Sequence, residues 1–514
     1  MAHTTTPTRP GTPTAAPTAT YPGSGRVIGV LLVTAFVMIL NETIMGVALP
    51  HLMRDFDITA SVAQWLATGY MLTMAVVIPA TGYLLNRFSI RPIALTAITL
   101  FTIGTLVAAL APGFGVLLLA RILQAAGTAV MMPLLMTTIL NVVPASRRGR
   151  TMGTISIVIA VAPAIGPTIS GLILSSLSWR WMFWFVLPIA VAALILAAFN
   201  VRNVTTQRPS TLDVLSLVLS AFAFAGLIFG LSSIGESLQG HAPMPIWIPL
   251  TVGAVSLAAF IWRQLVLQRN NTALLDLRTF ATPSFTFAVI LVFVSMMALF
   301  GALIILPLYL QNVLQLSTLS TGLLMLPGGL VMAVLSPVVG ALSDRIGAKR
   351  LVIPGTALIA TALILFTLTL GEHTAAPLIA VLLAVLNAGL AFTLTPLLSS
   401  ALGGLRPELY AHGSATISTL QQVAGATGTA LFITLMTSTT TSRLTDGASA
   451  LAAGAAGAHT SFLWGAMFAV AAVILACFLP RKKAAPATGG AGTTSGANGT
   501  KDEADAAPTS MPVH

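Results

Sequence analysis

Charged residues are scarce in this chain. Asp, Glu, Lys and Arg together make up only 7% of its 514 residues, whereas a soluble domain carries roughly 25%. So few charges cannot cover a water-exposed surface, which excludes an ordinary soluble protein and indicates that lipid covers most of the chain. The net charge of +11 would fit a nucleic-acid partner in a soluble protein. In a membrane protein basic residues collect in the loops, so we expect no nucleic-acid partner.

Cysteine is almost absent as well. Cys477 is the only cysteine, which excludes an internal disulfide and a cysteine-based metal cluster. The sequence contains no G-x-x-x-x-G-K-[ST] motif, so it offers no phosphate-binding loop for ATP-driven pumping. We therefore expect no catalytic residue, no metal site and no cofactor, in a chain that is not an enzyme.

Long apolar runs are what the sequence has in abundance. Hydrophobic residues make up 56% of the chain and the mean hydropathy is +0.94. The runs last about 20 residues, the length of a membrane-spanning helix, and are continuous rather than alternating. We predict an all-α membrane protein with fourteen transmembrane helices. The predicted spans cover residues 27–48, 62–84, 92–111, 115–140, 152–175, 181–200, 212–232, 245–265, 285–309, 320–342, 350–370, 376–402, 413–436 and 461–480.

An internal repeat divides these spans. The loop "GYLLNRFSIRP" (82–92) after the second span matches "GALSDRIGAKR" (340–350) after the tenth, so that two six-helix halves are related by a parallel repeat with two helices inserted between them. The predicted segments are a disordered cytoplasmic tail at 1–26, an N-terminal half at 27–200, inserted helices with linkers at 201–284, a C-terminal half at 285–480 and a second disordered cytoplasmic tail at 481–514.

Basic residues predict the orientation. Twenty of the 24 lysines and arginines fall on one side of the predicted spans, and only Arg54, Arg180 and Arg443 fall on the other, with Arg121 inside a span. Because loops on the cytoplasmic side carry the excess of Lys and Arg, this split places both termini in the cytoplasm of a multi-pass protein of the cytoplasmic membrane.

The two repeated loops are candidate gates. Asp344 can accept hydrogen bonds from a neighbouring helix N-terminus, or pair with Arg345 and Lys349, and either contact would tie two helices together on the cytoplasmic side. Ordinary loop charges are the alternative reading. The candidate gating residues are Gly82, Asn86, Arg87 and Arg91 in the first loop and Gly340, Asp344, Arg345, Gly347, Lys349 and Arg350 in the second.

The loop pattern G-x-L-x-D-R-x-G-x-K/R resembles the signature of the major facilitator superfamily. The stretches "LNETIMGVALP" (40–50), "ARILQAAGTA" (120–129), "SWRWMFWFVLPIA" (178–190) and "LPLYLQNVLQLSTLSTGLLMLPGG" (306–329) resemble its fourteen-helix drug:proton antiporter branch, the EmrB/QacA type. The resemblance extends from about residue 27 to residue 480. It departs in the first loop, where Asn86 stands for the usual aspartate and Ser89 for a glycine. We therefore expect a weaker contact between helices at that loop.

The resemblance includes the antiporter motif of the fifth helix, here "GTISIVIAVAPAIGPTISG" (153–171). Its matching residues are Gly153, Gly166, Pro167 and Gly171, while Ala162 and Ser170 stand where the family usually has glycine. Small residues on one helix face allow close backbone approach, and proline removes a backbone donor and permits a bend. The resemblance implies export by exchange.

Glu42 and Arg121 are the candidate proton-coupling residues. Each lies about six residues from the outer end of its span, or ~9 Å, so opposite charges occur at matching depth. Burial and a nearby guanidinium act in opposite directions on a carboxylate's protonation. Glu42 is the only acid deep in a span, although the family places its acid at the position of Asn41. Snorkelling of both side chains to the interface is the alternative.

The sequence offers only general features of a substrate site. Methionine-rich surfaces suit varied apolar shapes, and polar side chains within spans usually face the bundle interior. Core packing is the alternative for each methionine, and Trp65 and Tyr70 fit an interface belt equally well. The candidate substrate contacts are Gln124, Met131, Met297, Phe300, Asn387 and Gln421.

The resulting prediction is a secondary active transporter. It would exchange protons for apolar or cationic amphipathic drugs moving outward, by alternating access driven by the proton gradient. The alternatives are a dedicated exporter of one metabolite or natural product, a proton-coupled importer, and a membrane sensor or assembly scaffold. We expect a monomer whose partners are a small amphipathic substrate, protons and the lipid bilayer, and an adaptor protein stays open as a further partner.

Overall fold

The computed structural model describes residues 24–58, 60–201, 203, 213–234, 244–270 and 272–479. The predicted tail at 481–514, most of the tail at 1–26 and the linker residues 204–212 and 235–243 lie outside the described residues.

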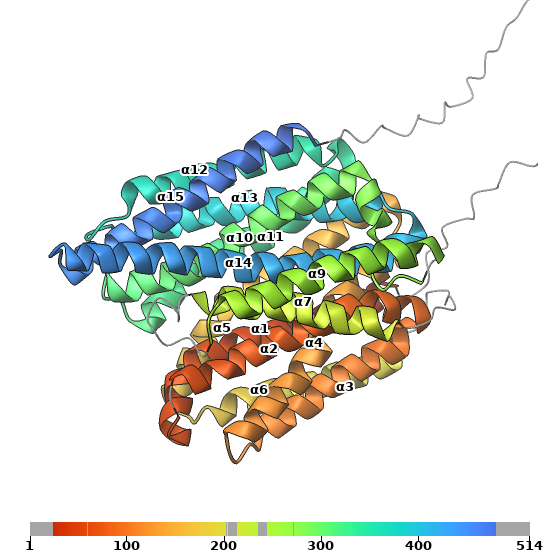
Figure 1. Cartoon of the computed structure of the whole chain (residues 1–514), viewed down its shortest axis with the longest axis horizontal. Coiled ribbons are helices and arrows are strands. Elements are labelled where there is room, and N and C mark those ends of the chain that lie inside the picture. Colours follow the sequence, from red (N-terminus) through yellow and green to blue (C-terminus); the bar gives the residue numbers. More distant parts are fainter. Residues whose placement is uncertain are drawn as a thin grey trace, which may run out of the picture. The chain divides into compact units, whose positions relative to one another are not determined.

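The described residues form long helices joined by short turns (Figure 1). The first group consists of α1 (Ser24–Phe56), α2 (Ala60–Arg87), α3 (Ile90–Ala109), α4 (Phe114–Val142), α5 (Arg148–Leu174) and α6 (Arg180–Asn200). The inserted pair consists of α7 (Val214–Ser232) and α9 (Trp247–Leu267). The second group consists of α10 (Pro283–Asn312), α11 (Thr318–Ile346), α12 (Lys349–Thr369), α13 (Ala376–Gly403), α14 (Tyr410–Thr445) and α15 (Ala450–Cys477). Short 3₁₀ turns are η1 (Ala145–Arg147), η2 (Gln268–Asn270), η3 (Leu277–Ala281) and η4 (Pro407–Leu409).

The all-α membrane class is confirmed, with thirteen helices in the described part of the chain long and apolar enough to cross a membrane. The predicted span at 413–436 lies within α14, which is not among the thirteen. Its stretch "GSATISTLQQ" is rich in Ser, Thr and Gln, which lowers its hydropathy. A polar helix of this kind is stable in a bilayer when its polar face meets other helices rather than lipid.

Helix ends follow local signals in the sequence. The side chain of Asp213 accepts a hydrogen bond from the backbone N–H of Ser216 at 3.1 Å and begins α7, as that of Ser317 begins α11. Gly347 ends α11 with a φ of 86°, a left-handed conformation that costs glycine little. The turn in the repeated loop at 340–350 therefore depends on this glycine.

The two helix groups meet along two seams. In one seam α5 packs along α11, and in the other α2 packs along α14, with further contacts of α13 with α5 and of α14 with α4. We call the end of the bundle that contains residues 87–91 and 346–350 the motif-loop end.

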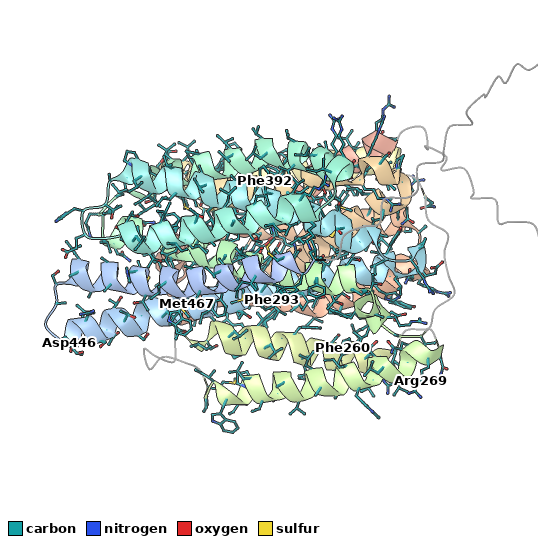
Figure 2. All side chains as sticks on the ribbon, turned by 90° about the horizontal axis from the view of Figure 1, so that it is seen from above. Phe260, Arg269, Phe293, Phe392, Asp446 and Met467 are labelled. Carbon is teal, nitrogen blue, oxygen red and sulfur yellow. The ribbon has the colours of Figure 1, made fainter. Side chains whose placement is uncertain are left out.

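The inserted pair bridges the second seam. In Figure 1, α7 and α9 run across the seam in which α14 of one group packs along α2 of the other, and α7 packs against both. Ala75 of α2, Phe224 and Ile228 of α7 and Val423 of α14 share one apolar cluster. Figure 2 shows the pair along one edge of the bundle, with Arg269 beyond α9 at the end of the bundle opposite to Asp446. The inserted helices therefore contact both groups.

Polar contacts join the two groups at the motif-loop end. The Asp344 carboxylate accepts from the backbone of α5, and the side-chain pairs are Thr137 with Ser414 at 3.2 Å, Ser156 with Thr395 at 2.8 Å, Arg148 with Tyr410 at 3.2 Å and Asn86 with His412 at 2.9 Å. The structure is thus closed at the motif-loop end.

Candidate functional site

A buried arginine forms the centre of the first candidate site. Arg121 of α4 is 1% exposed, so it does not snorkel to the interface. Its Nη1 donates to the Gln124 side-chain oxygen at 3.1 Å and to the Asn41 carbonyl oxygen at 3.4 Å. Its guanidinium carbon lies 4.1 Å from the centre of the Tyr70 ring. The charge is thus held by α1, α2 and α4 together.

Glu42 lies beside this arginine on α1. Its side chain is half-buried and interacts electrostatically with Arg121 and Tyr70. Within the described residues, no ion pair of 4.0 Å or less joins Glu42 to Arg121. Asn41, the preceding residue, is fully buried, and neither atom of its amide has a hydrogen-bond partner among the described residues. The structure therefore brings the two predicted charges together, with the acid at position 42 partly accessible.

Two neighbours fix the arginine in place. Gln124 also donates from Nε2 to the Thr105 hydroxyl at 3.0 Å, and the Tyr70 hydroxyl donates to the Thr128 hydroxyl at 2.9 Å. Both side chains are fully buried. The interface-belt interpretation of Tyr70 is therefore wrong, because its ring supports a buried cation. Gln124, proposed as a substrate contact, is occupied by Arg121 in this conformation.

Two substitutions at Tyr70 separate the contribution of its ring from that of its hydroxyl group. Tyr70→Leu removes the ring beneath Arg121, whereas Tyr70→Phe removes only the hydroxyl group. A desolvated cation–π contact is worth about 2 kcal/mol, so we expect Tyr70→Leu to lower the free energy of unfolding by about that much more than Tyr70→Phe. Thermal unfolding in detergent measures the difference. Equal losses in the two variants would contradict a role of the ring.

The antiporter motif packs α5 against two partners. A Cβ added at Gly153 would overlap the backbone of α11 at Ser336, and one at Gly166 would overlap Thr43 of α1. The Ser170 hydroxyl donates to the Ile44 carbonyl at 2.9 Å. Close approach is therefore confirmed at the first two glycines.

The other two residues of this motif have different outcomes. Gly171 has nothing within 4 Å of an added Cβ, so the prediction of close packing is wrong there, since the residue lies near the open C-terminal end of α5. Pro167 falls within α5, but its side chain lies outside the described part of the chain.

The second motif loop binds a helix N-terminus. Asp344 accepts hydrogen bonds from the backbone N–H groups of Gly149 at 2.8 Å and Arg150 at 3.1 Å, in the first turn of α5. This is the first of the two predicted contacts, and it places a carboxylate at the positive end of a helix dipole. Lys349 instead donates to the Cys477 carbonyl at 2.6 Å.

The other predicted gating residues have separate positions. Arg87, Arg345 and Arg350 are exposed. Arg91 donates to the Ala198 carbonyl within its own helix group at 2.9 Å. Gly82 lies against the His412 ring and the Leu274 carbonyl. These arginines therefore fit the alternative reading as loop charges in this conformation.

Two residues that join the helix groups at the motif-loop end, Gly149 and His412, escaped the sequence interpretation. Gly149 and Gly340 meet where α5 and α11 cross, and a Cβ added at either would overlap the backbone of the other. His412 bonds Asn86 across the second seam. The sequence did contain a feature that could have pointed to Gly149, a glycine in "RRGRT" at a helix start. For His412 it contained only the position of the residue at the border of a span.

A pocket lies between α5, α10, α11 and α13. Its cavity volume is about 50 Å³ in this conformation, and it is partly open to solvent. The predicted substrate contacts Phe300 and Asn387 line it, and among its lining residues Asn387 alone has a polar side chain. The Asn387 Nδ2 donates to the Leu383 carbonyl at 2.9 Å, which leaves Oδ1 as an acceptor for a bound molecule.

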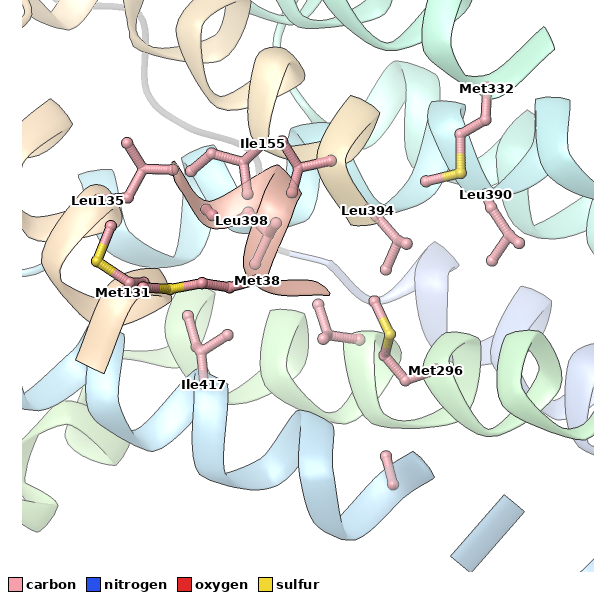
Figure 3. Close-up of a cluster of buried hydrophobic side chains, with 14 of the residues drawn as sticks. Met38, Met131, Leu135, Ile155, Met296, Met332, Leu390, Leu394, Leu398 and Ile417 are labelled. Carbon is pink, nitrogen blue, oxygen red and sulfur yellow. The ribbon is translucent and has the colours of Figure 1, made fainter. Parts of the chain in front are cut away.

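The remaining predicted substrate contacts do not line this pocket. Met131 packs in a buried apolar cluster, where Figure 3 shows it beside Met38. Met297 is buried, and its backbone lies against Gly428. Gln421 has a buried amide nitrogen that lacks a partner among the described residues. In this conformation the core-packing alternative therefore holds for the two methionines.

The α5 helix separates the pocket from the arginine site. Ile159 and Pro163 line the pocket, while one residue earlier than Pro163 the Ala162 carbonyl accepts from the Thr43 hydroxyl at 3.4 Å. Thr43 follows Glu42 directly. The α5 helix therefore contacts both the pocket and the segment of α1 that carries Glu42.

Comparison with known proteins decides the family. The model of the Major Facilitator Superfamily matches residues 31–429. The chain belongs to the major facilitator superfamily. It is therefore a multi-pass membrane transporter of small molecules and not an enzyme.

Two superfamily relatives resemble the chain over most of its length. The uncharacterized MFS-type transporter YcnB of Bacillus subtilis is 43% identical over 80% of this chain and 86% of its own. The lincomycin resistance protein LmrB of Listeria monocytogenes is 39% identical over 89% of this chain and 97% of its own.

A solved structure supports the fold. The human organic anion transporter MFSD10 superposes with a TM-score of 0.63 at 17% identity, covering 88% of this chain and all of that one. At this identity the likeness concerns the superfamily fold alone.

Proposed function

We propose that this chain is a proton-coupled antiporter of the fourteen-helix EmrB/QacA branch, exporting drug-like molecules by alternating access. The observation that carries the proposal is the placement of Glu42 beside the buried cation Arg121. An unpaired cation in a membrane interior is costly, so the guanidinium favours a charged carboxylate, while the surrounding apolar residues favour the protonated one. Such a balanced acid can release and regain a proton as its surroundings change.

The proposed coupling runs through α5. Substrate in the pocket touches Ile159 and Pro163, and a small displacement of α5 would be transmitted to Thr43 at Gly166 and Ala162. Glu42 lies in the same helical turn as Thr43. Binding of substrate would thereby bring Glu42 closer to Arg121, which favours the charged carboxylate, so that Glu42 releases its proton.

The remaining features of the proposal concern topology. Residues 27–200 and 285–480 would be the rocking halves related by the parallel repeat, with 201–284 inserted between them. The positive-inside bias places the motif-loop end and both termini in the cytoplasm of a cell-membrane protein. On this orientation the closed end faces the cytoplasm. The transporter would act as a monomer, with the proton gradient as its energy source and an adaptor as a further partner to be tested.

The pocket favours apolar substrates over cationic ones, because no charged side chain is found among its lining residues. The relative LmrB is named for resistance to lincomycin, which supports drug export and also supports the second candidate, export of a single compound. Everted vesicles with an acidic lumen distinguish a multidrug antiporter from a dedicated exporter of one compound. A multidrug antiporter accumulates several dissimilar compounds under the gradient, whereas a dedicated exporter accumulates only one, and accumulation of none would contradict both.

Asn387 should set the affinity for substrates that donate a hydrogen bond. A net hydrogen bond contributes about 0.5–1.5 kcal/mol, so Asn387→Leu should raise the half-saturation concentration of such substrates by about two- to twelvefold. Asn200→Leu is the matched control, because Asn200 makes the same bond to a carbonyl four residues earlier, at 2.9 Å, but is distant in sequence from the pocket helices and does not line the pocket. Equal effects of the two substitutions would contradict the assignment.

A further inference from the structure

The inserted pair is connected to the seam between α2 and α14 by a chain of polar contacts. At the start of α7, the Asp213 carboxylate binds Arg263 of α9 through two hydrogen bonds of 2.7 and 2.8 Å. These bonds lower the pKa of Asp213 to about 2, so the carboxylate stays charged at physiological pH. Asp213 also accepts from the Ser216 hydroxyl. The two inserted helices are therefore fastened to each other at the motif-loop end.

The chain of contacts continues from α9 to the segment before η3. Gln264 is fully buried, and its Nε2 donates to the Ser216 hydroxyl at 2.7 Å. Its Oε1 accepts from the backbone N–H of Leu275 at 3.1 Å. Leu274 and Leu275 are themselves buried in one cluster with Phe260 of α9. Gln264 thus holds the backbone at 274–275 in a fixed position.

This backbone fixes the ring of His412 on α14. The Leu274 carbonyl lies 3.2 Å from Nδ1 of His412, and because a carbonyl oxygen can only accept, Nδ1 carries the hydrogen. In the neutral ring Nε2 is then an acceptor, and it lies 2.9 Å from Nδ2 of Asn86 on α2. The charged groups that act on the His412 ring, Asp276 just before η3 and Arg278 within it, are paired with each other at 2.5 Å.

The residue at position 86 fits this neutral histidine. An asparagine donates a hydrogen bond to Nε2. An aspartate, the usual residue at this position in the family that the loop resembles, would place an acceptor against an acceptor unless the ring were protonated. Asn86 and His412 therefore form a neutral hydrogen bond between the two helix groups.

We propose that the inserted pair is a strap that stabilises closure at the motif-loop end, with Gln264 and the Leu274 carbonyl as positioning groups that aim His412 at Asn86. The strap acts on the equilibrium between closed and open states and does not depend on which substrate or ion is carried. It assigns a role to α7 and α9, which lie outside the pocket and outside the Glu42 site.

The test measures opening directly. Spin labels attached through the substitutions Ser146→Cys and Arg406→Cys, in a Cys477→Ser background, report the separation of the two groups at exposed motif-loop positions. We expect Gln264→Leu, His412→Leu and Asn86→Leu each to raise the open-to-closed ratio by roughly three- to twentyfold, the range of one interhelical hydrogen bond in a membrane. Gln268→Leu is the matched control, because the Gln268 Oε1 has no partner among the described residues.

A double substitution distinguishes the positioning of His412 by Gln264 from a general destabilisation of the fold. If Gln264 acts through His412, Gln264→Leu combined with His412→Leu should shift the ratio no further than His412→Leu alone. Additive shifts, or a wild-type distribution in both single variants, would overturn the strap. The readout needs neither substrate nor a proton gradient, so a failure of proton coupling leaves this result unaffected. His412→Leu and Asn86→Leu keep the test decisive if Gln264→Leu does not fold.

Discussion

Glu42→Gln should abolish accumulation driven by a pH gradient while leaving substrate exchange intact. Glutamine keeps the shape of the side chain and removes the proton-carrying group. One pH unit corresponds to about 1.4 kcal/mol, so an exchange of one proton for one neutral substrate sustains up to about a tenfold concentration ratio per unit. Everted vesicles with an imposed gradient should show this ratio for the wild type and a ratio near one for the variant.

Glu372→Gln is the matched control for this experiment. It makes the same change at an exposed acid in the turn between α12 and α13. We expect its accumulation ratio to equal that of the wild type. Full gradient-driven accumulation by Glu42→Gln would show that another group carries the proton, and loss of exchange as well as accumulation would indicate structural damage instead.

Gly340→Ala should destabilise the closed state at the motif-loop end. The added Cβ would overlap the Gly149 carbonyl, and because the obstacle is backbone rather than a flexible side chain, α5 and α11 must separate. Overpacking of this kind costs about 1–3 kcal/mol, which would reduce the closed population about 5- to 150-fold relative to the open one. Transport that passes through the closed state should slow accordingly. Labels at Ser146→Cys and Arg406→Cys measure the population.

Gly171→Ala is the control for this prediction, because an added Cβ there meets nothing within 4 Å on the same helix α5. It should leave both the closed population and the transport rate unchanged. A wild-type closed population in Gly340→Ala would contradict the role of the glycine crossing.

The fold could largely be predicted from the sequence, because a lipid bilayer permits few kinds of spanning structure. Continuous apolar runs predict spanning helices, and the match of residues 82–92 to residues 340–350, an offset of 258, predicts the repeat. The exception is α14, whose polar face makes its run weak while its packing against α2, α4 and α10 keeps it helical. Hydropathy reports what a helix contains and does not report which neighbours cover its polar side.

The candidate site could be predicted from the sequence only in part. Glu42 and Arg121 stand out because charge inside a span is costly. Tyr70 and His412 do not, since an aromatic ring or a histidine at a span border gives no sign of its partners, which come from α4 in one case and from α2 and residue 274 in the other. The candidate substrate contacts were the weakest prediction, because a methionine in a cavity and one in a core look identical in sequence.

Proton flux coupled to substrate movement tests the central claim most directly. Proteoliposomes containing the purified protein are loaded with substrate and a lumenal pH indicator, then diluted into substrate-free buffer at equal pH with the membrane potential clamped. The antiport account predicts that the lumen acidifies as substrate leaves, and that Glu42→Gln abolishes the acidification. Substrate efflux with unchanged lumenal pH, or with alkalinisation, would contradict proton antiport.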